Sequence, residues 1–135
     1  MNTQVIIPRE KTYKLLEGHY RAKIVGVINK PAKSGEGIVC CIHFEVQVRG
    51  RERYDCCARA IFPLDLSPNS QLRCFLEGLL GKQFFTDRSG QPLDLNRELG
   101  DLDCEIDLVH GKHDPKYEWP MVVVESASPA TKEAN

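Results

Sequence analysis

Six arginines and lysines fall at positions where a sheet would bring them onto one surface. They lie in three segments in which apolar and polar residues alternate, His19–Ile28, Ile38–Arg49 and Arg51–Phe62, the last two joined across Gly50. The six cations are Arg21, Lys23, Arg49, Arg51, Arg53 and Arg59. Guanidinium groups pair with phosphate through forked N–H donors and stack on flat rings. This spacing therefore predicts a basic face that recognises a polyanion.

Two loops, Asn29–Gly37 and His110–Glu118, are predicted to flank that face, and both contain turn-forming residues. Their lysines are Lys30 and Lys33 in the first loop and Lys112 and Lys116 in the second. Side chains on which a base could stack are scarce, and the candidates are Tyr117, Trp119 and, as a weaker platform, His43. We expect the two loops to form opposite walls of a groove for a ligand strand.

Carboxylates alternate with apolar residues along a later segment. The four acids are Asp101, Asp103, Glu105 and Asp107. Such a ladder can hold a divalent cation for phosphodiester cleavage, but no lysine or histidine is interleaved with these acids. The favoured interpretation is a solvated face that discourages edge-to-edge strand pairing. A second set, His110, His113 and Asp114, lacks a fourth zinc ligand. We therefore expect no metal, no other cofactor and no catalysis.

The six cysteines do not have the spacing of a metal site. Cys40–Cys41 and Cys56–Cys57 are adjacent pairs, whose side chains point to opposite faces of a strand. A zinc knuckle instead uses two-residue spacers, so that two sulfurs converge on one ion. Together with Cys74 and Cys104, these residues are interpreted as small buried hydrophobes. A thiol cluster near Cys41 and Cys57, with a redox or metal role, stays open.

The predicted elements are three strands, one helix and two further strands. The helix spans about Ser70–Leu80, with Ser70 as its cap and Gly81 ending it, and Lys82–Gly100 is predicted to be a connector. The last strands lie near Asp103–Val109 and Met121–Glu125. This order predicts a mainly β fold, a five-stranded OB-fold-like Greek-key barrel with one short helix between the third and fourth strands.

The alternation also predicts which side chains face the core, because successive residues of a strand point to opposite faces. The core positions are Tyr20, Ala22, Ile24, Gly26 and Ile28 in the first segment, Ile38, Cys40, Ile42, Phe44, Val46 and Val48 in the second, and Tyr54, Cys56, Ala58 and Ala60 in the third. One apolar face indicates a sheet that is buried on one side and wet on the other.

Length and charge set further bounds. The 135 residues suit one domain, divided into an N-terminal extension (1–16), an OB-fold-like domain (17–125) and a disordered tail (126–135). No apolar run approaches the roughly 18 residues of a membrane span, and Met1–Arg9 lacks a secretory pattern, so we expect a cytoplasmic protein. Residues 1–60 carry eleven cations against six acids, and residues 61–135 seven against thirteen. Such asymmetry suggests a partner for one half.

Four stretches are similar to the phage- and plasmid-encoded OB-fold single-stranded DNA-binding proteins. They are Glu17–Ala22 opening the first strand, the leucine-rich Leu72–Leu80, Leu99–Ile106 leading into a strand, and Val122–Pro129. The resemblance implies a small protein that protects or organises single strands in replication or recombination of a mobile element. The segment Ser126–Asn135 departs from that pattern, because it is not strongly acidic.

The leading hypothesis is therefore non-catalytic binding of single-stranded DNA, with RNA left open. One alternative is a protein-interaction module, or an oligomeric OB-fold subunit, that uses the acidic half of the chain. The other is a metal-dependent phosphodiesterase that uses the acidic ladder. Neither a small-molecule substrate nor a membrane partner is expected, and the oligomeric state stays open.

Overall fold

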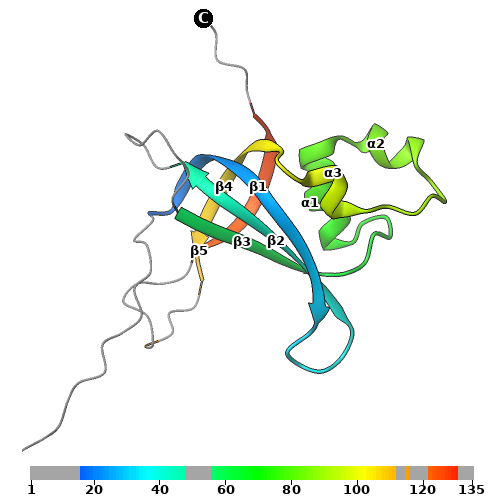
Figure 1. Ribbon diagram of the computed structural model, residues 1–135, viewed down its shortest axis with the longest axis horizontal. Helices are drawn as coiled ribbons and strands as arrows, with labels where there is room; N and C mark the ends of the chain where they lie inside the picture. Colours follow the sequence, from blue (N-terminus) through cyan, green and yellow to red (C-terminus); the bar gives the residue numbers. More distant parts are fainter. Residues whose placement is uncertain (1–15, 48–55, 112–114, 116–121, 131–135) are drawn as a thin grey trace, which may run out of the picture.

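The computed structural model describes residues 16–47, 56–111, 115 and 122–130. Five strands and three short helices follow one another along the chain (Figure 1). The strands are β1 (Gly18–Pro31), β2 (Ile38–Gln47), β3 (Cys56–Pro63), β4 (Asp103–His110) and β5 (Val122–Pro129). The helices, all between β3 and β4, are α1 (Gln71–Leu80), α2 (Lys82–Asp87) and α3 (Leu95–Leu99). The prediction of a mainly β chain is confirmed.

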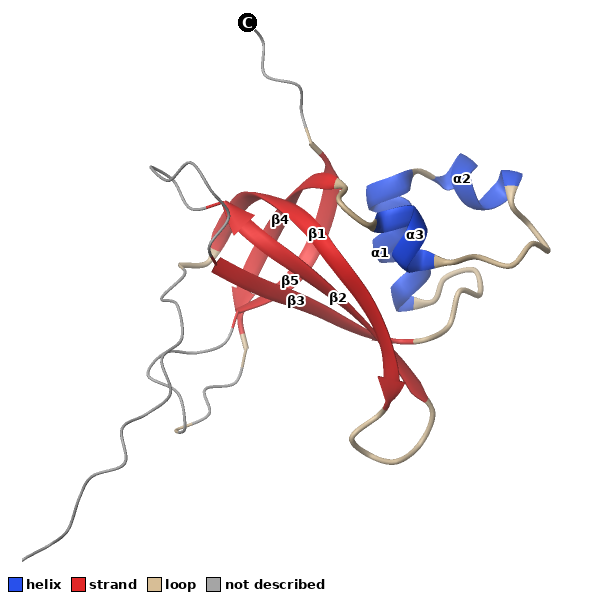
Figure 2. Ribbon diagram, in the orientation of Figure 1, coloured by secondary structure: helices blue, strands red, loops and turns tan. Residues whose placement is uncertain are grey.

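The five strands form one mixed sheet in the order β1-β2-β3-β5-β4. The sheet closes on itself as a barrel, because β1 pairs antiparallel with both β2 and β4. The contact between β3 and β5 is parallel, with Arg59 and Val123 as register partners. Figure 2 shows the helices gathered at one end of this barrel, with the β1–β2 hairpin projecting beyond it.

Alternation along the strands produces the core, as predicted for most positions. Ala22, Ile24, Ile42, Phe44 and Ala60 are all fully buried inside the barrel. The helix α1 covers one end of this core with Leu72, Phe75, Leu76 and Leu79. The ring of Phe75 lies edge-on to Phe44, with centroids 6.5 Å apart. Burial of these apolar side chains is the main stabilisation that a small barrel can obtain.

A β-bulge in β1 overturns the predicted facing of several residues. The register between β1 and β2 shifts between Ile24 and Gly26, so that Val25 is an extra residue. One extra residue moves every later side chain to the other face. Val27 consequently packs against the core, whereas Ile28, predicted to be a core residue, is 53% exposed. Ile38 is also 53% exposed, because it lies where the hairpin projects beyond the barrel.

The segment predicted as a connector contains two helices instead. Phe85 of α2 and Leu95 and Leu99 of α3 are buried, and this packing stabilises helices that are too short to persist alone. The guanidinium of Arg73 lies 4.6 Å from the Phe85 ring centroid and joins α1 to α2. The prediction for α1 is confirmed, because the Ser70 side chain accepts a hydrogen bond from the Arg73 backbone N–H at 3.1 Å.

The chain ends differ from the predicted boundaries as well. Strand β5 continues through Pro129, so residues 126–129 belong to the barrel rather than to a disordered tail. The polar side chains of this stretch alternate with buried Ala127, which explains why composition alone misassigned it. The turn predicted at Gly50 and most of the predicted N-terminal extension lie outside the described residues. In the part of the chain that is described, no helix has the length and apolarity needed to cross a membrane.

Candidate nucleic-acid interface

The structure places six of the predicted binding residues. These are Arg21, Lys23, Lys30, Lys33, His43 and Arg59. The others lie outside the described residues and stay predictions: Arg49, Arg51, Arg53, Lys112, Lys116, Tyr117 and Trp119. The six placed residues do not form one continuous basic face. Arg21 and Lys23 lie beside the carboxylates of β4, whereas the other four lie on or near the outer face of β1, β2 and β3.

Arg21 and Lys23 lie beside the acidic ladder. In the β1–β4 register Arg21 is opposite Glu105 and Lys23 is opposite Asp103, while Lys23 also faces Glu45 of β2. Register partners on one face bring their Cβ atoms to about 4.5–5.5 Å, where opposite charges attract. These two cations thus have carboxylate residues opposite them on the neighbouring strands. The interpretation of the ladder as protection of a strand edge is wrong, because β4 is paired on both sides, with β1 and β5.

His19 is a site residue that sequence reasoning missed. Its Nδ1 lies 3.0 Å from Asp107 Oδ1 and its Nε2 lies 3.1 Å from Glu105 Oε1, while the Ser126 hydroxyl donates to Asp107 Oδ2 at 2.6 Å. Hydrogen bonds to Asp107 and Glu105 raise the pKa of His19. Hydrogen bonds from Ser126 and His19 lower the pKa of Asp107. The only advance signal was that His19 shares the outward alternation of Arg21 and Lys23.

This cluster ties three strands together rather than forming a metal centre. His19 comes from β1, Asp107 and Glu105 from β4, and Ser126 from β5. Among the residues that the structure describes, no group of three His, Cys, Asp or Glu side chains is placed to hold a metal ion. Both imidazole nitrogens already face carboxylates, which suits a protonated histidine that links strands.

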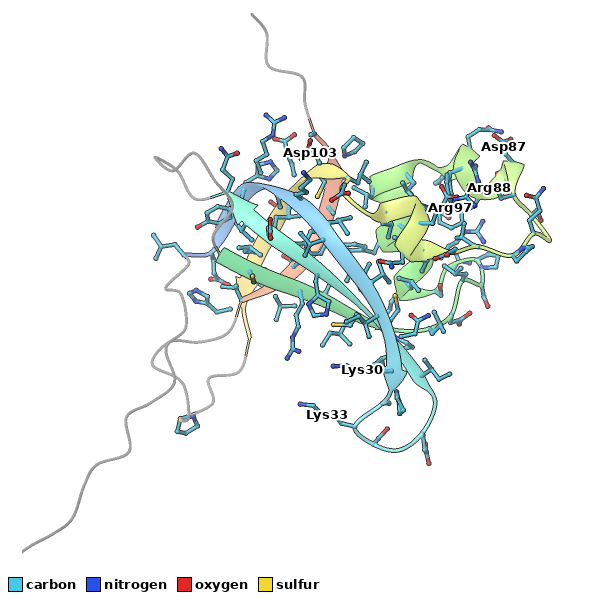
Figure 3. The ribbon with its side chains drawn as sticks, viewed as in Figure 1. Lys30, Lys33, Asp87, Arg88, Arg97 and Asp103 are labelled. Atoms are coloured by element: carbon cyan, nitrogen blue, oxygen red, sulfur yellow. The ribbon has the colours of Figure 1, made fainter. Side chains whose placement is uncertain are left out.

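The remaining cations gather on a different surface, the outer face of β1, β2 and β3. After the bulge, Gly26, His43 and Arg59 lie in one row across the three strands. The next row is Ile28, Cys41 and Ile61, and the row after it is Lys30, Val39 and Pro63. We call this surface the β1–β3 outer face and define it by these nine residues. Lys33 lies nearby in the hairpin loop (Figure 3).

The middle of the β1–β3 outer face is apolar and its borders are basic. Ile28 and Ile61 are 53% and 43% exposed, and Cys41 between them is fully buried. Lys30 borders them on one side and Arg59 on the other. Figure 3 shows Lys30 and Lys33 at the projecting end of the hairpin, far from Asp103. An apolar strip between cations can contact flat rings while the cations contact phosphates.

His43 lies in the same row as Arg59, opposite it on the neighbouring strand. Burial lowers the pKa of His43 below its usual value, and the charges of Arg59 and Lys30 lower it further. At neutral pH the imidazole is therefore uncharged and presents a flat ring beside the isoleucines. Residue types alone mark His43 as a weak stacking platform, but they could not show that the charges of Arg59 and Lys30 act on its pKa.

The cysteines separate into two groups. Burial raises the pKa of Cys40 to about 11 and that of Cys104 to about 12, which makes both thiols unreactive. Cys57 and Cys74 are exposed, so the prediction that they are buried hydrophobes is wrong. Cys41 and Cys57 share the outward alternation, but the row of His43 and Arg59 lies between them. The Cys56 side chain lies outside the described residues.

Comparison of the chain with protein-family models, with curated proteins and with solved structures finds no match.

Proposed function

We propose that this protein is an OB-fold that binds single-stranded nucleic acid, with single-stranded DNA as its leading ligand and without catalysis. The strand order, the parallel contact between β3 and β5, and the helices between β3 and β4 support this class. OB-folds bind oligonucleotides across their second and third strands and the neighbouring loops. The resemblance noted above supports a role in replication or recombination of a mobile element.

The observation that carries the proposal is the composition of the β1–β3 outer face. Lys30 and Arg59 flank exposed Ile28 and Ile61, with the neutral ring of His43 beside them. Phosphates would pair with the cations, and bases would lie on the apolar strip and the imidazole. Duplex bases are stacked and paired, so their faces are hidden, whereas an unpaired strand can present them. The surface therefore favours single strands.

The acidic ladder restricts the part of the barrel over which a nucleic-acid strand would lie. Asp103 and Glu105 lie on the β4 side of β1, where they would repel phosphate and where Lys23 is flanked by Glu45 and Asp103. A polyanion is consequently expected to lie over β2 and β3 rather than over β1 and β4. Among the placed cations, Lys30, Lys33 and Arg59 should contribute more to binding than Arg21 and Lys23.

Fluorescence anisotropy with a labelled oligonucleotide of about 30 bases, single- or double-stranded, tests the proposal at two salt concentrations. We expect preference for the single strand and a slope of log affinity against log salt of about −0.7 per phosphate neutralised. Arg59→Glu and Lys30→Glu should each weaken binding by at least tenfold, since both remove and reverse a charge at the interface. Lys82→Glu reverses an exposed charge at the start of α2 and serves as the matched control. The absence of binding at low salt, or equal loss in the Lys82→Glu control, would overturn the proposal.

A further inference from the structure

A cavity of about 450 Å³ lies against the projecting part of the hairpin, on the side of β1 opposite to Lys30. Its lining includes Val27, Asn29, Leu64, Leu93, Asp94 and Asn96. Asn29 and Lys30 are neighbours on one strand, so their side chains point to opposite faces. The cavity and Lys30 of the β1–β3 outer face thus lie on opposite faces of the same strand. Its volume is in the range typical of small-ligand sites.

Two polar side chains in this cavity are held in fixed orientations. Asn96 Oδ1 accepts a hydrogen bond from the Val27 backbone N–H at 3.1 Å, so the amide NH₂ of Asn96 keeps both of its donors. Asp94 Oδ1 accepts from the Arg97 backbone N–H at 3.2 Å as the cap of α3, so its second oxygen stays an acceptor. Burial of Leu95 and Leu99 anchors the short helix that carries these groups.

The edge of β1 is open beside the cavity. Strand β4 pairs with β1 only over Gly18–Lys23. The Val27 N–H points to Asn96, away from β2, and alternation of the ladder turns the backbone N–H and C=O of Asn29 to the same side. Within the described ranges, these two groups have no hydrogen-bond partner. They add one donor and one acceptor at the rim of the cavity.

We infer that this cavity binds one unpaired nucleobase that carries an exocyclic amino group, an inference that rests on the proposed function. Leucine walls suit the flat faces of a base, and the amide donors, the carboxylate and the open strand edge suit its polar edge. The carboxylate of Asp94 repels phosphate but accepts hydrogen bonds from an amino group. Adenine, cytosine and guanine have such a group and thymine does not. A strand with a phosphate at Lys30 would turn one base past the edge of β1 into the cavity.

The test compares an oligo(dT) with an oligonucleotide of equal length in which every second base is dC. We expect the wild-type chain to bind the dC-containing strand on the order of tenfold more tightly, the discrimination typical of one well-placed polar contact to a base. Asp94→Ser removes the carboxylate while keeping a side chain that can cap α3. It should abolish the preference for the dC-containing strand. Asp87→Ser, which removes an exposed carboxylate from α2, is the matched control and should keep the preference (Figure 3).

A second readout does not need DNA binding. Titration with free deoxycytidine should shift the NMR signals of the Val27 and Asn96 backbone amides, and thymidine should shift them far less. Binding of both oligonucleotides with equal affinity, together with no shift from deoxycytidine, would overturn the base cavity and leave the proposed function standing. Shifts from deoxycytidine with no oligonucleotide binding would support the cavity and overturn the proposed function.

Discussion

His43 and Arg59 face each other across β2 and β3, and the positive charge of Arg59 adds to burial in lowering the pKa of His43. Arg59 is also the register partner of Val123, where β3 meets β5. Arg59 therefore lies both at the contact between β3 and β5 and on the proposed binding surface. A bound phosphate near Arg59 would offset the positive charge that, together with burial, lowers the pKa of His43.

The pH dependence of binding follows from this pair. The lowered pKa of His43 means that the free protein keeps the ring neutral at pH 7, while a bound phosphate favours the protonated form. We expect oligonucleotide affinity to rise as the pH falls below the usual histidine pKa of about 6.5. Anisotropy titrations between pH 5 and 8 would measure it. His43→Gln should bind with a flatter pH profile, and an unchanged profile in that variant would contradict the prediction.

The linkage around His19 predicts a pH window for stability. Because the pKa of His19 is raised in the folded protein, His19 stabilises the fold at pH values below the usual histidine pKa of about 6.5. This stabilisation is lost as the pH rises through the pKa that His19 has in the folded protein. Because the pKa of Asp107 is lowered in the folded protein, Asp107 stabilises the fold at pH values above the usual aspartate pKa of about 3.9. This stabilisation is lost as the pH falls through the pKa that Asp107 has in the folded protein. The cluster thus contributes most between these two limits.

Thermal denaturation of His19→Asn against the wild type would measure this contribution. Because His19 is more than half exposed, we expect a loss of only about 0.2–1 kcal/mol within the window. The difference between the two proteins should shrink above the folded pKa of His19. A constant difference from pH 5 to 9 would show that His19 acts through packing instead.

Substitution of two glycines by alanine should affect the stability of the fold differently. A Cβ at Gly100 would lie 2.8 Å from the backbone oxygen of Asn96, so Gly100→Ala should destabilise the fold by about 1–3 kcal/mol. A Cβ at Gly26 would have nothing within 4 Å, so Gly26→Ala is the matched control and should be tolerated. Urea denaturation measures both. Equal stability of the two variants would refute the close approach at Gly100.

Thiol labelling tests burial and the binding surface together. Cys57 and Cys74 should react in the folded protein, whereas Cys40, Cys41 and Cys104 should react only after unfolding. Cys57 lies one row from Arg59 on the outward side of β3, while Cys74 lies on α1. A bound oligonucleotide should therefore slow labelling of Cys57 and not of Cys74, as mass spectrometry of labelled peptides would show. Equal protection of both thiols would argue against the β1–β3 outer face.

Local patterns in the chain were enough to predict the main elements. Period-two alternation correctly predicts that Ile24, Ile42 and Phe44 are buried, because the facing of a strand residue depends only on its immediate neighbours. The start of α1 at Ser70 follows in the same way from a side chain that caps nearby backbone N–H groups. The helices α2 and α3 escaped prediction because buried contacts of Phe85, Leu95 and Leu99, rather than propensity, hold them.

The sequence by itself determined the strands, the helix α1 and the alternation of apolar and polar faces. Only the tertiary structure decided which charges become neighbours: it set Asp103 and Glu105 beside Lys23 and Arg21, and it brought Lys30, His43 and Arg59 onto one surface. The physical reason is that lateral pairing joins residues far apart in the chain, and the bulge at Val25 reverses the facing of all that follow it in β1. Neither the pairing of distant strands nor the bulge can be recognised from a short stretch of the sequence.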